Sequence, residues 1–260
     1  MKLALLRGLT GVVAATAICT LGYAGEQPAP EPRKGGGDAS PTASKGEAAL
    51  KEASGAGKHL YLFFYSEDNE ATREVRKSFE ATLAKLTDVA QYVALNKDAP
   101  EEKALVAKYR LEAAPMPLIL VVAPNGVITQ ACIGRYLSEE DLRAGIASPA
   151  QQKVLKALQD KKLVLVCAYD KTVPADGPAM KGINEFRADA RYAALTEVVR
   201  VDPTDAAEAG FMGQLGIDPK DASSRAVTLV LAPPRSLLKR FNGVVTKDGL
   251  LGALTSAGSG

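Results

Sequence analysis

The chain has 260 residues, of which 47% are hydrophobic and 24% are charged, and its formal net charge is +2. This length allows one large domain or two of ordinary size, and the composition is typical of a globular protein with a buried core. Aromatic residues make up only 5% and tryptophan is absent, which argues against a stacking surface for sugars or single-stranded nucleic acid.

Residues 1–24 have the layout of a secretory signal peptide. Two cations within residues 1–7 precede about 14 apolar or small residues that end at Leu21, and the small residue Ala24 favours cleavage after it. A membrane anchor is the alternative, but the run is shorter than the roughly 20 residues that span a bilayer. A lipoprotein signal ending at Cys19 is a weaker alternative. We therefore expect an exported protein, periplasmic or extracellular, whose mature chain has no stable membrane insertion.

Cleavage after Ala24 would change the charge and the cysteine count. The mature chain would be formally neutral, which leaves no electrostatic argument for a nucleic-acid partner. Two cysteines would remain, Cys132 and Cys167, each inside an apolar strand-like run and neither in a Cys-x-x-Cys. Two buried thiols are the favoured interpretation, although an oxidising compartment leaves a disulfide between them open.

Residues 25–46 are rich in proline, glycine, alanine and serine and offer little to bury. This composition predicts a flexible linker, with the folded sequence beginning at Glu47.

From there the chain repeats itself. Four segments recur in the same order about 105 residues later: 58–65 with 161–169, 91–102 with 197–208, 118–134 with 228–243, and 137–146 with 245–254. The offset between the paired segments grows along the chain, as small insertions in the second copy would produce. We predict two homologous domains, at 47–147 and 151–257.

Within each copy the expected order is helix, strand, helix, strand, helix, strand, turn, strand, helix. In the first copy, an apolar stripe at helical spacing runs from Val75 to Leu86, and "LILVVA" at 118–123 is a continuous apolar run, typical of a strand covered on both faces. Asn125-Gly126 then suits a hairpin. The pattern predicts an α/β protein in which each domain has a mixed central sheet flanked by helices.

This order resembles the thioredoxin fold. In the first copy "YLFFYSEDNEATREV" at 61–75 lies where that family has its central strand, active-site loop and long helix, and "MPLILVVAPNG" at 116–126 resembles its proline segment and hairpin. The resemblance implies a cis peptide bond at Met116-Pro117, with an ordinary trans proline as the alternative. In the second copy "ADGPAMKGI" at 175–183 resembles the active-site motif without its cysteines, and Val227 stands where the proline is expected.

The departure from the family concerns its chemistry. By this resemblance the two cysteine positions hold Asp68 and Ala71 in the first copy and Asp176 and Ala179 in the second. Thiol–disulfide exchange needs a nucleophilic thiolate and a resolving thiol, and a carboxylate supplies neither. An Asp at a helix start is instead expected to cap the helix. We predict that both sites are redox-inactive.

Other catalytic chemistries find little support in the sequence. His59 is the only histidine, which excludes histidine-based nucleophilic schemes and histidine-rich zinc sites. The acidic residues Glu67, Asp68 and Glu70 lack the spacing of a calcium loop and suit a solvated helix start. We predict no catalytic residue, no metal and no cofactor.

The expected function is therefore binding of a polypeptide or of an envelope partner. In active relatives an extended substrate strand lies beside the cis-proline, and strand pairing does not need the cysteines. The candidate groove consists of six residues: Ser66, Glu67, Asp68, Asn69, Met116 and Pro117. Two alternatives stay open: a thiol-disulfide oxidoreductase that uses Cys132 or Cys167, and a structural scaffold or spacer.

Overall fold

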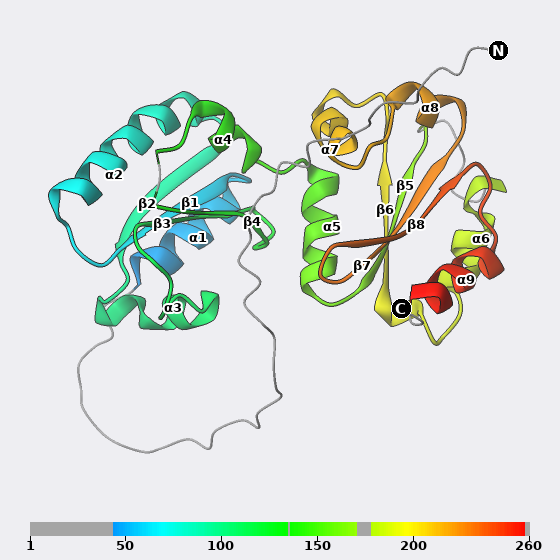
Figure 1. Cartoon of the computed structure of the whole chain (residues 1–260), viewed down its shortest axis with the longest axis horizontal. Helices are drawn as coiled ribbons and strands as arrows, with labels where there is room; N and C mark the ends of the chain where they lie inside the picture. Colours follow the sequence, from blue (N-terminus) through cyan, green and yellow to red (C-terminus); the bar gives the residue numbers. More distant parts are fainter. Residues whose placement is uncertain (1–43, 135, 171–177, 258–260) are drawn as a thin grey trace, which may run out of the picture. The chain divides into compact units, whose positions relative to one another are not determined.

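Figure 1 shows a computed structural model of the chain, which describes residues 44–134, 136–170 and 178–257. The predicted signal peptide and all but the last three residues of the predicted linker lie outside this part. No helix in the described ranges is both long and apolar enough to cross a bilayer.

The first copy folds into a four-stranded sheet with helices on both faces. Parallel β1 and β2 are neighbours, and β3 and β4 follow in antiparallel pairing, so the strand order is β2-β1-β3-β4. Its main elements are α1 (Lys45–Gly55), β1 (His59–Tyr65), α2 (Glu70–Leu83), β2 (Ala90–Asn96), α3 (Lys103–Tyr109), β3 (Leu118–Val122), β4 (Ile128–Ile133) and α4 (Glu139–Ala144). Short 3-10 turns, η1 (Ala84–Leu86) and η2 (Pro100–Glu102), precede β2 and α3.

The second copy repeats this arrangement, with the strand order β6-β5-β7-β8 and the same strand directions. Its elements are α5 (Pro149–Gln159), β5 (Leu163–Ala168), α6 (Pro178–Arg187), η3 (Ala193–Leu195), β6 (Thr196–Val201), η4 (Ala206–Glu208), α7 (Ala209–Gln214), α8 (Pro219–Ser224), β7 (Val227–Ala232), β8 (Ser236–Asn242) and α9 (Lys247–Ala257). The short helix α8 has no counterpart before β3, so part of the growing offset between the copies is an insertion here.

This strand order, with β1 and β2 parallel and β3 antiparallel to β1, is that of the thioredoxin fold. Both copies have it, which confirms the predicted α/β architecture of two tandem thioredoxin-like domains. The expected order of elements is confirmed in the first copy, and the second copy adds α8 before β7. The apolar stripe of α2 packs on the sheet, although its last member, Leu86, lies in η1.

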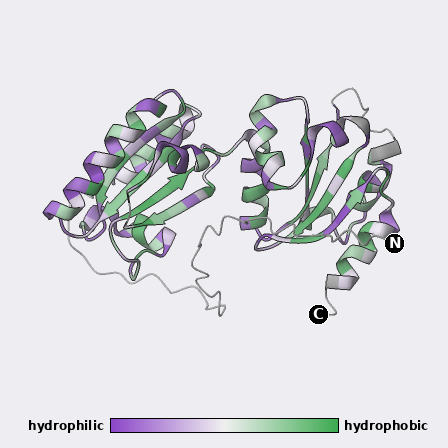
Figure 2. Cartoon of the chain, turned by 45° about the horizontal axis from the view of Figure 1, so that its top comes forward, coloured by the Kyte–Doolittle hydropathy of each residue, from purple (hydrophilic) through white to green (hydrophobic). Residues whose placement is uncertain are grey.

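Each domain has a core on both faces of its sheet, and Figure 2 shows the central strands as its most apolar part. Alternate side chains of β1 enter opposite clusters: Leu60, Leu62 and Phe64 pack with α1 and α3, whereas Tyr61 and Phe63 pack with α2 and α4. Every residue of the four core clusters is contacted from within its own copy, so each domain builds its own core.

A buried glutamate caps the first helix of each domain. Glu102, 2% exposed, accepts hydrogen bonds from the Ser44 hydroxyl at 2.7 Å and from the Lys45 N–H at 2.8 Å. Glu208, 5% exposed, accepts from the Ser148 hydroxyl and from the Ala150 N–H at 2.9 Å. These bonds satisfy helix N-terminal donors that have no partner within the helix.

The two serines also define where the helices begin. Ser44 and Ser148 each accept a hydrogen bond from the N–H three residues on, as helix N-caps do. Helix α1 therefore begins at Lys45, inside the segment predicted to be linker, and α5 begins at Pro149, two residues before the predicted start of the second domain.

Candidate functional site

The candidate site of the first domain lies where β1 ends at Tyr65 and α2 begins at Glu70. The loop between them holds the four predicted residues 66–69, of which Glu67, Asp68 and Asn69 are exposed. The resemblance places this loop where active relatives carry their reactive cysteine.

Asn69, and not Asp68, caps the helix. The Asn69 side chain accepts a hydrogen bond from the Thr72 N–H at 2.9 Å, which is the N-cap geometry. The expectation that Asp68 caps α2 is therefore wrong, because the chain turns into the helix one residue later than the motif alignment implies.

The Asp68 carboxylate instead pairs with a cation of the same helix. Its Oδ1 lies 3.2 Å from a guanidinium nitrogen of Arg76, and its carbonyl oxygen accepts from Arg73 at 2.5 Å. The Arg76 guanidinium also lies 5.7 Å from the centre of the Tyr65 ring. The position that the resemblance assigns to the nucleophile thus carries a carboxylate paired with Arg76, in a residue whose backbone carbonyl is bound by Arg73. Ala71 is exposed on the first turn of α2 and has no reactive group.

Met116 and Pro117 lie at the same end of the sheet as this loop. Because β3 is antiparallel to β1 and Leu118 pairs with Phe64, the chain before β3 meets the chain after β1. The Met116-Pro117 peptide bond is cis, as predicted. Met116 is half-buried against the core. The strand pairing brings all six predicted groove residues to one end of the sheet.

The backbone of Met116 is open to a further strand. The Pro117 carbonyl accepts from the Gly134 N–H at 2.8 Å, but the N–H and C=O of Met116 make no hydrogen bond with any described residue. A backbone N–H and C=O without partners in the described structure, placed where a strand begins, are groups with which an extended chain can pair.

The second domain departs further from the family. Ala179 lies in the first turn of α6, and Asp176 lies outside the described residues. The ladder places Ala226 at the position of Pro117, since the Ala226 carbonyl accepts from Gly243 as the Pro117 carbonyl does from Gly134. The prediction that Val227 stands at that position is wrong by one residue. Val227 pairs with Ala168 of β5 in the way that Leu118, the residue after Pro117, pairs with Phe64 of β1.

The two cysteines lie in different sheets and are not joined in a disulfide. Cys132 is in β4 and Cys167 in β5, and their exposed fractions are 8% and 0%. Burial raises the pKa of Cys167 to about 12, which disfavours the nucleophilic thiolate at neutral pH. Neither lies at a helix start.

His59 has a structural position. It is 4% exposed, and its Nε2 accepts a hydrogen bond from the Ala147 N–H at 3.1 Å, which ties the end of the first domain to β1. Burial lowers the pKa of His59 to about 4, so the ring is neutral at pH 7 and can accept this bond.

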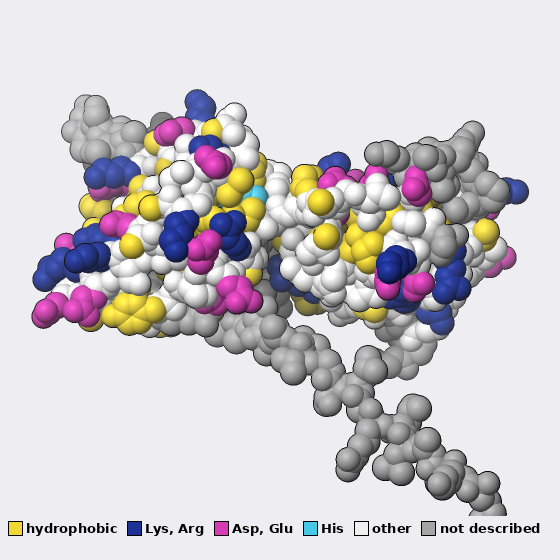
Figure 3. All heavy atoms as spheres, turned by 90° about the horizontal axis from the view of Figure 1, so that it is seen from above, with side chains coloured by type: hydrophobic (Ala, Val, Ile, Leu, Met, Phe, Trp, Pro, Cys, Tyr) yellow, Lys and Arg dark blue, Asp and Glu magenta, His cyan; other side chains and the backbone are white. Residues whose placement is uncertain are grey.

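Figure 3 shows lysine and arginine side chains interspersed with aspartate and glutamate side chains over one face. Within residues 44–134, 136–170 and 178–257, no three His, Cys, Asp or Glu side chains are grouped so that they could hold a metal ion.

Sequence reasoning missed the buried glutamates. Glu102 and Glu208 occupy equivalent places in the repeat, at the ends of the segments 91–102 and 197–208. A glutamate kept at the same place in both copies was the available signal.

Comparisons with known proteins agree with the fold and add no activity. No protein-family model and no curated protein matches the chain. Similar solved structures include Trxlp from Edwardsiella tarda, with 14% identity over 40% of this chain and 95% of that one and a TM-score of 0.32. The thioredoxin Deadhead from Drosophila melanogaster has 18% identity over 39% of this chain and 90% of that one, with a TM-score of 0.31. Another is a disulphide isomerase from Xylella fastidiosa, with 17% identity over 39% of this chain and 75% of that one and a TM-score of 0.28. At these values the likeness concerns the fold alone.

Proposed function

We propose that this chain is an exported, redox-inactive tandem thioredoxin-like protein that binds an extended polypeptide of an envelope partner. The binding edge is the end of the first sheet where the loop 66–69 meets Met116 and Pro117.

One observation carries the proposal: Met116 has peptide groups without a partner, while an ion-paired acid stands where the resemblance expects the nucleophile. The N–H and C=O of Met116, beside its cis bond to Pro117, bind no residue that the structure describes. Asp68, at the nucleophile position, is bound to Arg76. Binding by strand addition depends on main-chain groups and needs no thiol.

The redox part is tested by insulin reduction with the mature chain and dithiothreitol. The expected rate equals that without protein, because the buried thiols have no route to a substrate disulfide. Turnover that disappears in Cys132→Ser or Cys167→Ser would establish the oxidoreductase alternative instead.

The binding part is tested with a photo-crosslinking amino acid at Glu67, with the same group at exposed Glu52 on α1 as the matched control. We expect polypeptides from an envelope extract to crosslink at position 67 and not at 52. The double variant Met116→Ala/Pro117→Ala should reduce this yield severalfold. Equal yields with and without these two substitutions would rule out the groove, and no crosslink at either position would favour the spacer alternative.

A further inference from the structure

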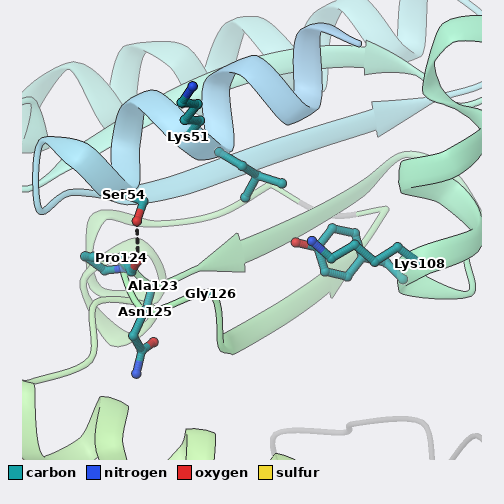
Figure 4. Close-up of a pocket in the computed structure, with 9 residues that line it drawn as sticks. Lys51, Ser54, Lys108, Ala123, Pro124, Asn125 and Gly126 are labelled. Carbon is teal, nitrogen blue, oxygen red and sulfur yellow. Dashed lines mark hydrogen bonds between the residues drawn. The ribbon is translucent and has the colours of Figure 1, made fainter.

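The first domain has a second open feature, at the opposite end of β3 from the proposed groove. A pocket of about 490 Å³ lies between α1, the end of α3 and the turn Ala123–Gly126, as shown in Figure 4. This volume is within the range of small-molecule sites in proteins, roughly 300–1,000 Å³. Ser54 and Pro124 close one side, since the Ser54 hydroxyl donates to the Pro124 carbonyl at 2.7 Å.

The pocket is cationic and partly aromatic. Lys51 and Lys108 line it together with Tyr109 and Leu50, and no carboxylate lines it. Neither lysine forms an ion pair within the described part of the chain, and the Tyr109 hydroxyl makes no hydrogen bond there. The Lys108 ammonium lies 5.4 Å from the centre of the Tyr109 ring. Burial raises the pKa of Tyr109, so its hydroxyl remains a donor.

The second domain serves as an internal comparison, because the Ser–Glu caps align the helices of the two copies. Counted from those caps, Lys51 corresponds to Leu155, Lys108 to Gln214 and Tyr109 to Leu215. The buried positions Leu105 and Val106 correspond to buried Phe211 and Met212. The fold therefore needs the apolar positions, whereas the cations and the ring are a property of the first copy alone.

We propose that this pocket binds a small aromatic anion, whose ring lies against Tyr109 and Leu50 and whose acidic group pairs with the Lys108 ammonium beside that ring. Lys51 points away from Lys108 in Figure 4 and adds positive charge at the rim of the pocket. The aromatic group of the ligand would pack on the half-buried Tyr109 ring and Leu50, and its acidic group would compensate Lys108, which forms no ion pair within the described part of the chain. The proposal is independent of polypeptide binding, because none of its residues belongs to the groove.

The test uses the fluorescent aromatic anion 8-anilinonaphthalene-1-sulfonate with the mature chain at low ionic strength. Lys108→Gln should raise Kd about fivefold, because a pair of unit charges about 4 Å apart in water attracts by about 1 kcal/mol. Lys51→Gln should raise Kd less, because its ammonium points away from Lys108. Tyr109→Leu, the residue of the second copy, should raise Kd as well. Lys77→Gln, an exposed lysine of α2 that lines no part of the pocket, is the matched control and should leave Kd unchanged.

Two outcomes would overturn the proposal. The first is a set of pocket variants that bind the dye as wild type does, or that lose no more affinity than Lys77→Gln. The second is displacement of the dye by inorganic phosphate to a greater extent than by chloride of equal ionic strength, which would mark a plain anion site without need of a ring. Near-UV circular dichroism of every variant excludes dye binding to partly unfolded chain, because a molten globule binds the dye and loses this signal while it keeps its far-UV signal.

Discussion

At the scale of single residues, buried charge is the costly feature of this molecule. Glu102 and Glu208 are removed from water, and each carboxylate is satisfied by a serine hydroxyl and at least one helix N–H. If such an acceptor lost its donors, the folded state would be destabilised by the full desolvation free energy of the carboxylate. The hydrogen bonds of Glu102 and Glu208 therefore hold α1 and α5 in place on their domains.

Glu102→Gln should therefore destabilise the first domain by about 1–3 kcal/mol, because an amide NH2 would face donors that now bind oxygen. Urea unfolding followed by circular dichroism measures the change. Glu101→Gln is the control, since the side chain of this partly exposed neighbour makes no hydrogen bond in the described structure. Equal stability of the two variants would contradict the capping role.

His59 makes the first domain sensitive to acid. Its folded pKa of about 4 lies below the unfolded value of 6.5, so the unfolded state takes up a proton first. The stability that this residue contributes is complete above pH 6.5 and is lost as the pH falls from 6.5 towards 4, by up to about 3 kcal/mol. Urea midpoints of wild type and His59→Gln across this range should converge on acidification. Parallel curves would show that the ring does not titrate in this way.

At the scale of elements, the start of α2 illustrates how a helix end is assigned. Asn69 caps the helix, whereas Asp68 forms an ion pair with Arg76. The side chains of Arg76 and Asp68 are 23% and 50% exposed. Exposed pairs of this kind stabilise little, because water screens them.

Asn69→Ala should accordingly cost about 1 kcal/mol, and Asp68→Ala less than about 0.5 kcal/mol. Thermal unfolding of both variants beside wild type separates the two roles. A larger loss of stability for Asp68→Ala than for Asn69→Ala would show that Asp68 caps the helix.

At the scale of the whole molecule, each domain has its own core and one buried thiol, Cys132 in the first and Cys167 in the second. Thiol labelling at intermediate urea therefore reports the opening of each domain separately. Glu102→Gln should accelerate labelling of Cys132 several-fold and leave Cys167 unchanged, and Glu208→Gln should do the reverse. Peptide mapping by mass spectrometry distinguishes the two thiols, and equal acceleration of both would mean that the domains unfold as one unit.

Much of the fold could be predicted from the sequence because its signals are local. The continuous apolar run at 118–123 became the fully buried β3, and the Asn125-Gly126 turn became the hairpin, with Gly126 at φ 81°. The meeting of the chain after β1 with the chain before β3 at one end of the sheet was also predictable, because the order of strands decides which chain ends meet.

Other parts of the site could not be predicted. The cap at Asn69 depends on where the chain turns into α2, and the position of Ala226 depends on ladder register, which the motif alignment placed one residue away. The pocket beside Tyr109 depends on three segments that are distant in sequence.

The sequence by itself determined the repeat, the order of elements and the absence of cysteines at the positions where the resemblance expects them in each copy. Hydrophobic periodicity, turn residues and motif spacing are local properties that can be read within each segment. Only the tertiary structure decided that Ser44 meets Glu102 and Ser148 meets Glu208, 58 and 60 residues apart, and that Asp68 meets Arg76. Such contacts form only when the sheet brings distant segments together or when the loop takes a particular course, and neither is encoded in a local pattern.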